Sequence, residues 1–166
     1  MSAVQHGTRP GYSSRVDRTT VPAELALLLE TWPQPDRDEQ AFPLVTVDEN
    51  GFPHVMLLCT AELLATADRG ALLVAVVSAT ARANLARDGA ATLIAADGSA
   101  AHYTKLRVHE TTEHDGFAVF TCHVAHYKRD SLGIPLHPMG FRATKAVAES
   151  ERWTRTRAAL SRHASD

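Results

Sequence analysis

Residues 71–97, ALLVAVVSATARANLARDGAATLIAAD, change their pattern twice. Residues 71–77 are apolar throughout, which is typical of a strand buried on both faces. Residues 78–88 carry polar and basic side chains among alanines, and Gly89 is a suitable C-terminal stop. We therefore expect a short helix there, followed by another strand over residues 90–97.

Upstream of this segment, residues 41–60, AFPLVTVDENGFPHVMLLCT, contain two β-rich runs around Asn50-Gly51. Asn-Gly favours a tight hairpin because both residues tolerate a positive φ. Pro53 suits the opening of the second strand, where it removes no essential hydrogen bond of the ladder. The sequence therefore predicts a β-hairpin before the apolar strand.

Downstream, polar and apolar side chains alternate within residues 101–111. On a strand this alternation places Tyr103, Lys105 and Arg107 on one face. Residues 115–127 predict a sixth strand. Helices are expected at residues 21–32, with Thr20 as the cap, and at residues 143–162. Six strands without a crossover helix after each one indicate a mainly β protein with flanking helices, built as an antiparallel barrel without exposed edges.

The length of 166 residues predicts one domain, over residues 21–166, preceded by a flexible arm over residues 1–20. A formal net charge of -2 argues against a nucleic-acid binder and against attraction to acidic membranes. There is no apolar run of about 20 residues and no signal peptide, so we expect a cytoplasmic protein. Cys59 and Cys122 are expected to be buried, reduced thiols.

The sequence contains no GxSxG, HExxH or phosphate-binding P-loop motif. His123 and His126 are three residues apart, and on a regular strand this spacing places them on opposite faces. We therefore expect no metal site, and the nine histidines are interpreted as scattered surface residues.

The start of the helix at residues 78–88 has two interpretations. A helix N-terminus offers unpaired N–H groups and a partial positive charge, which favour a phosphate. Ser78 and Thr80 add hydroxyl groups, and Arg82 and Arg87 add cationic side chains. Alternatively, Thr80 caps a surface helix and the arginines are solvated. The local pattern alone favours capping.

The order of the elements adds a resemblance. The hairpin PLVTVDENGFPHVMLL, the strand–helix–strand of residues 70–97 and the following YxKxR strand are similar to the pyridoxamine 5'-phosphate oxidase-like, FMN-binding split-barrel family. The similarity covers about residues 41–110. It implies a six-stranded antiparallel split β-barrel with Greek-key connectivity.

The resemblance also implies an FMN held at the interface of a homodimer. The phosphate would lie near Ser78, Thr80, Arg82 and Asn84, and the isoalloxazine ring would lie along the strand of residues 54–57. Lys105 would be a second cation for the phosphate or the ring, or else a solvated residue. Many members carry Lys or Arg where this chain has Ala81, and Arg82 is the next cation. The implied cofactor-binding residues are His54, Val55, Met56, Leu57, Ser78, Thr80, Arg82, Asn84 and Lys105.

The implied activity is that of an FMN-dependent oxidoreductase acting on a small molecule, with a nicotinamide cofactor as a possible reductant. Haem or a deazaflavin is an alternative cofactor, and a non-catalytic, flavin-binding dimeric module is an alternative function. The C-terminal sequence RWTRTRAALSRHASD lacks the Arg/Pro signature of the vitamin B6 oxidases, which argues against oxidation of pyridoxamine phosphate.

Overall fold

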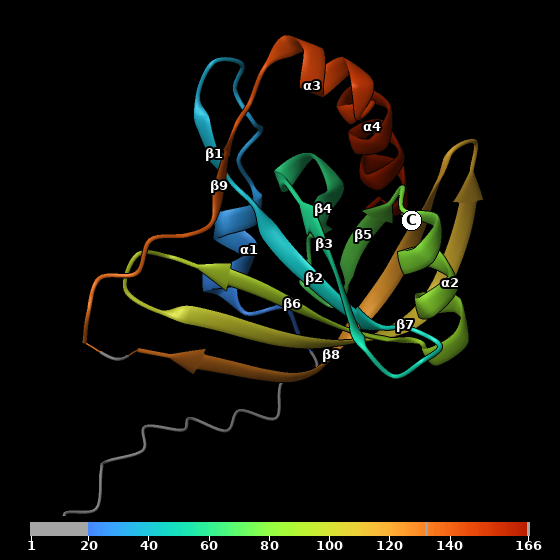
Figure 1. Cartoon of the computed structure of the whole chain (residues 1–166), viewed down its shortest axis with the longest axis horizontal. Coiled ribbons are helices and arrows are strands. Elements are labelled where there is room, and N and C mark those ends of the chain that lie inside the picture. Colours follow the sequence, from blue (N-terminus) through green and yellow to red (C-terminus); the bar gives the residue numbers. More distant parts are fainter. Residues whose placement is uncertain (1–19, 132, 166) are drawn as a thin grey trace, which may run out of the picture.

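A seven-stranded antiparallel sheet forms the body of the protein in a computed structural model that describes residues 20–131 and 133–165 (Figure 1). The strand order is β3-β2-β6-β7-β8-β5-β4, and β1 and β9 form a separate two-stranded sheet. The predicted arm lies outside the described residues except for Thr20. The strands are β1 (Asp38–Gln40), β2 (Phe42–Val47), β3 (Pro53–Leu58), β4 (Leu63–Ala65), β5 (Leu72–Val76), β6 (Ala90–Ala96), β7 (Ala101–His114), β8 (Phe117–Asp130) and β9 (Gly140–Arg142).

The chain connection between the two edge strands explains why this sheet is curled. β3 and β4 are the outermost strands, yet only residues 59–62 separate them in sequence, including the 3-10 helix η1 (Thr60–Glu62). One end of each edge strand must therefore lie close to the other. Within the described residues no backbone pairing joins β3 to β4, so closure into a barrel and Greek-key connectivity stay predictions.

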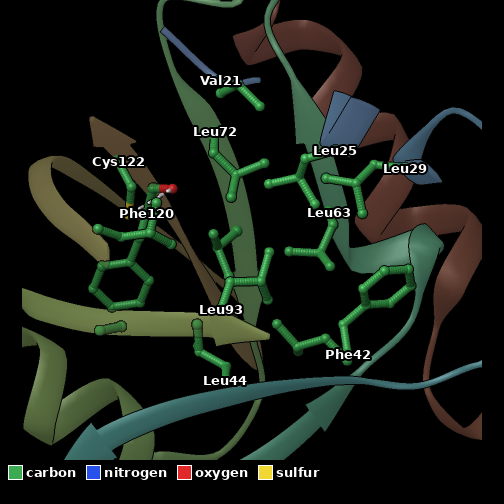
Figure 2. Packing of buried hydrophobic residues seen from close by; sticks show 14 of the residues in the cluster. Val21, Leu25, Leu29, Phe42, Leu44, Leu63, Leu72, Leu93, Phe120 and Cys122 are labelled. Atoms are coloured by element: carbon green, nitrogen blue, oxygen red, sulfur yellow. Dashed lines mark hydrogen bonds between the residues drawn. The ribbon is translucent and has the colours of Figure 1, made fainter. Parts of the chain in front are cut away.

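The apolar segment predicted to be buried on both faces is confirmed as β5. Its side chains at Leu72, Val74 and Val76 enter the main core inside the curl. Leu73 and Ala75 point the other way and pack with residues of helix α4 (Trp153–His163). α1 (Ala23–Leu29) adds leucines to the main core beside β4 and β5 (Figure 2).

The predicted hairpin is confirmed as β2–β3, in the register Val47↔Pro53. Its connection is longer than a two-residue turn, because Asp48 Oδ1 accepts hydrogen bonds from the N–H groups of Asn50 and Phe52, both at 2.9 Å. Only Gly51 of the Asn-Gly pair adopts a positive φ, at 84°. The carboxylate of Asp48 therefore shapes the loop.

The number of strands differs from the six expected because of β4, a three-residue strand directly after η1. β1 and β9 were also not predicted. Each has three residues, which is too short for an alternating pattern to be visible in the sequence.

The helix expected over residues 143–162 is two helices, α3 (Lys145–Ser150) and α4. Arg152 separates them in the left-handed conformation, with φ 55°. The break turns Trp153 into a buried cluster with Cys59, Ala61 and Ala143. The expected cap at Thr20 is also wrong, since Pro22 is the N-cap of α1 and no side chain caps the helix.

The prediction that His123 and His126 lie on opposite faces of their strand is wrong, because β8 contains a β-bulge. Lys105 pairs with His126, and the next residue of β7, Leu106, pairs with Val124, so Ala125 is skipped. The extra residue shifts the alternation. His123 and His126 consequently lie on the same exposed face.

Candidate functional site

The site begins where β5 ends and α2 (Ala79–Asp88) starts. Ser78 is the N-cap, and its Oγ accepts a hydrogen bond from the N–H of Ala81 at 3.2 Å. The N–H of Arg82 donates to the carbonyl of Ser78 at 3.0 Å. Within the described residues, the N–H groups of Ala79 and Thr80 make no hydrogen bond. The first turn of α2 therefore keeps two donors for an anion, and Ser78, rather than Thr80, is the capping residue.

Asn84 connects this helix to the β2–β3 hairpin. Its side-chain amide donates to Thr46 Oγ1 at 3.0 Å, and the Thr46 hydroxyl donates to the carbonyl of His54 at 3.4 Å. Asn84 and Thr46 are both buried. Arg87 adds a second connection, because its guanidinium donates to the carbonyl of Val47. The two segments implicated by the resemblance, residues 54–57 and 78–84, thus lie side by side.

Two polar side chains of α2 remain available to a ligand. Thr80 is exposed on the first turn. Arg82 has a side chain that is 32% exposed, and its contact with Glu113 is a 3.8 Å ion pair with a carboxylate that is itself 70% exposed. Such an exposed pair is weak, so the guanidinium of Arg82 can turn toward an anion at little cost.

A cleft of about 470 Å³ separates α2 from the hairpin loop. Asp48 and Glu49 supply its hairpin side, and the cation that lines it, Arg87, also pairs with Asp88 at 2.7 Å. The negative charge on the hairpin side disfavours a phosphate deep in the cleft. The lining residues are Asp48, Glu49, Asn50, Ala79, Thr80, Ala83, Asn84 and Arg87.

The four implicated residues of β3 divide between two faces. His54 and Met56 pair with the buried residues Thr46 and Leu44, and are themselves half-buried. Val55 and Leu57 point outward and are 53% and 54% exposed. β3 is an edge strand, so part of its backbone points away from β2 with no partner among the described strands.

Lys105 shares the outer face with Val55 but lies far from it. The registers connect Val55 to Val45, Val45 to Thr92, and Thr92 to Lys105. β2 and β6 therefore stand between β3 and β7. Within one subunit the structure does not bring Lys105 to the start of α2, and its side chain is exposed.

The sequence reasoning missed one polar cluster, formed by the buried residues His102 and Tyr127 and the more exposed Asp97. His102 has no exposed surface, and its ring nitrogens lie 2.7 Å from Tyr127 Oη and 3.0 Å from Asp97 Oδ2. Burial acts to raise the pKa of Asp97, but hydrogen bonds from Ser99, His102 and Ala100 outweigh it and hold that pKa well below its usual range. The position of His102 on the buried face of an alternating strand was the available signal.

A second missed cluster lies around Cys59 and Glu62. Both side chains are buried, and Glu62 Oε2 accepts a hydrogen bond from the N–H of Cys59 at 2.8 Å. Burial raises the pKa of Glu62 to about 7. Cys122 is also buried, and the described residues contain Cys59 and Cys122 as free thiols, as expected.

The described residues contain no group of three or more His, Cys, Asp or Glu side chains placed to hold a metal ion. None of the helices in this part of the chain is both long and apolar enough to cross a membrane.

The solved structures that are similar to this chain over part of its length include the following three. The styrene monooxygenase flavin reductase from Pseudomonas putida S12 has a TM-score of 0.49 and 13% identity, covering 60% of this chain and 85% of that chain. A candidate oxidoreductase from Sinorhizobium meliloti 1021 has a TM-score of 0.47 and 10% identity, covering 70% of this chain and 52% of that chain. A conserved hypothetical protein from Mycobacterium tuberculosis has a TM-score of 0.45 and 12% identity, covering 74% and 95%.

No protein-family model matches the sequence, and no curated protein sequence is significantly similar to it.

Proposed function

We propose that this protein is an FMN-binding flavoprotein that acts as an oxidoreductase on a small molecule. The observation that supports this most is the contact of Asn84 with Thr46 and, through Thr46, with His54. It places α2 beside β3, which is the arrangement required if one nucleotide contacts both. The sequence resemblance assigns the phosphate to the first segment and the isoalloxazine ring to the second.

The residues at the start of α2 fit a phosphate group. The N–H groups of Ala79 and Thr80, the Thr80 hydroxyl and the Arg82 guanidinium would hold it. Ser78 and Asn84 have a different part in this proposal. Their side chains hydrogen-bond Ala81 and Thr46, so they fix the orientation of the helix end toward the phosphate.

The edge strand β3 fits the isoalloxazine ring. Its outward backbone N–H and C=O groups can hydrogen-bond the polar edge of the ring, and Val55 and Leu57 offer apolar surface to its face. When bound, FMN would supply the hydride or electron transfer, so the protein's contribution is binding, orientation and exclusion of water. This is in keeping with a chain in which no catalytic triad motif was found.

A homodimer is part of the proposal. The outer face of β2 and β3, including the intervening loop, exposes Val47, Phe52, Val55 and Leu57, of which Phe52 is 68% exposed. A second copy covering these side chains would remove apolar surface from water and enclose the flavin ring. In such a dimer Lys105, which is distant from α2 within one subunit, could serve the flavin of the other subunit.

The visible absorption spectrum of the purified protein tests the cofactor. Flavin bands, present on purification or after adding FMN, support the proposal. A Soret band would identify haem instead and contradict it. A protein without colour that leaves the fluorescence of added FMN unchanged also contradicts the proposal. Light scattering tests the dimer separately, because it measures whether the protein in solution has twice the mass of one chain.

A further inference from the structure

A second cavity, of about 220 Å³, lies between the C-terminal end of β3 and the segment that contains β9, α3 and the start of α4. Its walls are mostly apolar, and Phe141 and Trp153 meet edge to face there with ring centroids 6.0 Å apart. The lining residues are Ala41, Leu57, Leu58, Cys59, Glu62, Phe141, Val147, Glu151 and Trp153.

The polar groups of this cavity are two carboxyl groups and a thiol. Glu62 is 7% exposed, and its Oε2 accepts the hydrogen bond from the Cys59 N–H. The side chain of Cys59 also hydrogen-bonds this carboxyl group. Glu151 supplies the second carboxyl group, at a more exposed position. None of the ion pairs among the described residues involves Glu62, and burying an ionised carboxylate without a cation is costly.

The described part of the chain does not place a cation in this cavity. Arg157 is near η1, but its guanidinium donates to the carbonyls of Thr60 and Leu63, at 2.9 and 3.0 Å, and is not among the lining residues. Burial raises the pKa of the Cys59 thiol far above its usual range, so Cys59 contributes no negative charge. The ionisable groups that face the cavity and can carry a negative charge are therefore the carboxyl groups of Glu62 and Glu151.

We propose that this cavity binds a small organic ammonium ion. The ammonium group donates to the carboxylate of Glu62 and is attracted to Glu151, and the apolar body of the ligand packs on Trp153, Phe141 and Val147. A cation compensates the charge of the buried carboxylate and can also interact favourably with the aromatic faces. The volume is below the roughly 300–1,000 Å³ of pockets for drug-sized ligands, so the ligand is small.

This site is separate from the start of α2, and its binding of an amine does not require FMN. Leu57 is the residue that connects the two, because it lines the cavity from the strand that we assign to the flavin ring. The experiment below uses the protein without added flavin. If no amine binds, the proposed FMN-binding function is unaffected. If FMN does not bind, the proposed amine site is unaffected.

Isothermal titration calorimetry with benzylamine and benzyl alcohol tests this proposal, since the two probes differ mainly in charge. We expect benzylamine to bind at least about ten-fold more tightly, as a charge-assisted hydrogen bond to a buried carboxylate predicts. Glu62→Gln keeps an acceptor for the Cys59 N–H but removes the charge, and should abolish that preference. Glu149→Gln is the matched control, because Glu149 is an exposed residue of α3 paired with Lys145 and does not line the cavity.

Val147→Phe reduces the volume of the cavity and leaves Glu62 and Glu151 unsubstituted, and should weaken the binding of both probes. Melting curves of each variant confirm that it is folded. The proposal is overturned if benzylamine shows no saturable binding at millimolar concentration, if both probes bind the wild-type protein equally, or if folded Glu62→Gln and Val147→Phe both bind benzylamine like the wild type.

Discussion

The side-chain amide of Asn84 donates a hydrogen bond of 3.0 Å to Thr46 Oγ1, across 38 residues of sequence. Both side chains are buried, and Thr46 donates in turn to the backbone carbonyl of His54. These hydrogen bonds fix α2, the helix that follows β5, to the hairpin. Because hydrogen bonds are directional, they restrict the orientation of the helix more narrowly than apolar contacts do. Any ligand that spans α2 and β3 depends on this connection.

A double-mutant cycle should show that Thr46 and Asn84 act together. Asn84→Ala leaves the buried hydroxyl oxygen of Thr46 without its donor, and Thr46→Val leaves the buried amide of Asn84 without its acceptor. We therefore expect each substitution to lower the free energy of unfolding by about 1–3 kcal/mol. The double variant should lose less than the sum of the two. Urea unfolding measures all three variants. Additive losses would mean that the two side chains do not interact.

The stability of the protein should fall as the pH rises toward and above neutrality, because of Glu62. Burial raises the pKa of this carboxyl group from 4.5 to about 7 in the folded protein. The folded state therefore binds more protons than the unfolded state between these values, and its stability is fully present below pH 4.5 and is lost as the pH rises through 7. The full loss is up to about 3 kcal/mol.

Glu62→Gln removes this titration while keeping the acceptor for the Cys59 N–H. Its free energy of unfolding should increase relative to the wild type between pH 5 and pH 8 in urea titrations without added amine. Parallel pH profiles of the two proteins would show that Glu62 ionises in the folded state as it does in the unfolded chain.

Arg152→Gly should stabilise the protein. Arg152 adopts φ 55° between α3 and α4, where a residue with a Cβ is strained and glycine is not. We expect the free energy of unfolding to increase by about 0.5–1 kcal/mol. Glu151→Gly is the matched control, since Glu151 has φ -84° and the same change there should destabilise. A loss of stability in Arg152→Gly would show that contacts of the arginine side chain outweigh the strain.

The elements with strong local signals could be predicted from the sequence. The apolar segment that forms β5 is buried on both faces, as its composition indicates. α2 ends at Gly89, which adopts φ 59°. The hairpin around Gly51 also forms, although Asp48 determines its loop in a way that the Asn-Gly pair does not reveal.

The features that escaped prediction depend on contacts between distant residues. The break at Arg152 is set by the burial of Trp153 against Cys59, and nothing in the local helical pattern marks it. The bulge at Ala125 exists only relative to β7. The resemblance placed residues 54–57 and Ser78 to Asn84 at one site, and the structure brings these segments together, but the engagement of Asn84 by Thr46 required the fold.

The central claim, that FMN binds with its phosphate at the start of α2, is tested most directly by titrating the protein into FMN and following flavin fluorescence. The wild-type protein, Arg82→Ala and Arg142→Ala should be compared. Arg142 is an exposed arginine on β9 paired with Asp38, and it serves as the control. We predict saturable binding that Arg82→Ala weakens by about ten-fold or more, as the loss of a charge-assisted phosphate contact requires, and that Arg142→Ala leaves unchanged. Equal affinities for all three proteins would contradict the assigned phosphate site, and an absence of binding by the wild-type protein would contradict the flavin itself.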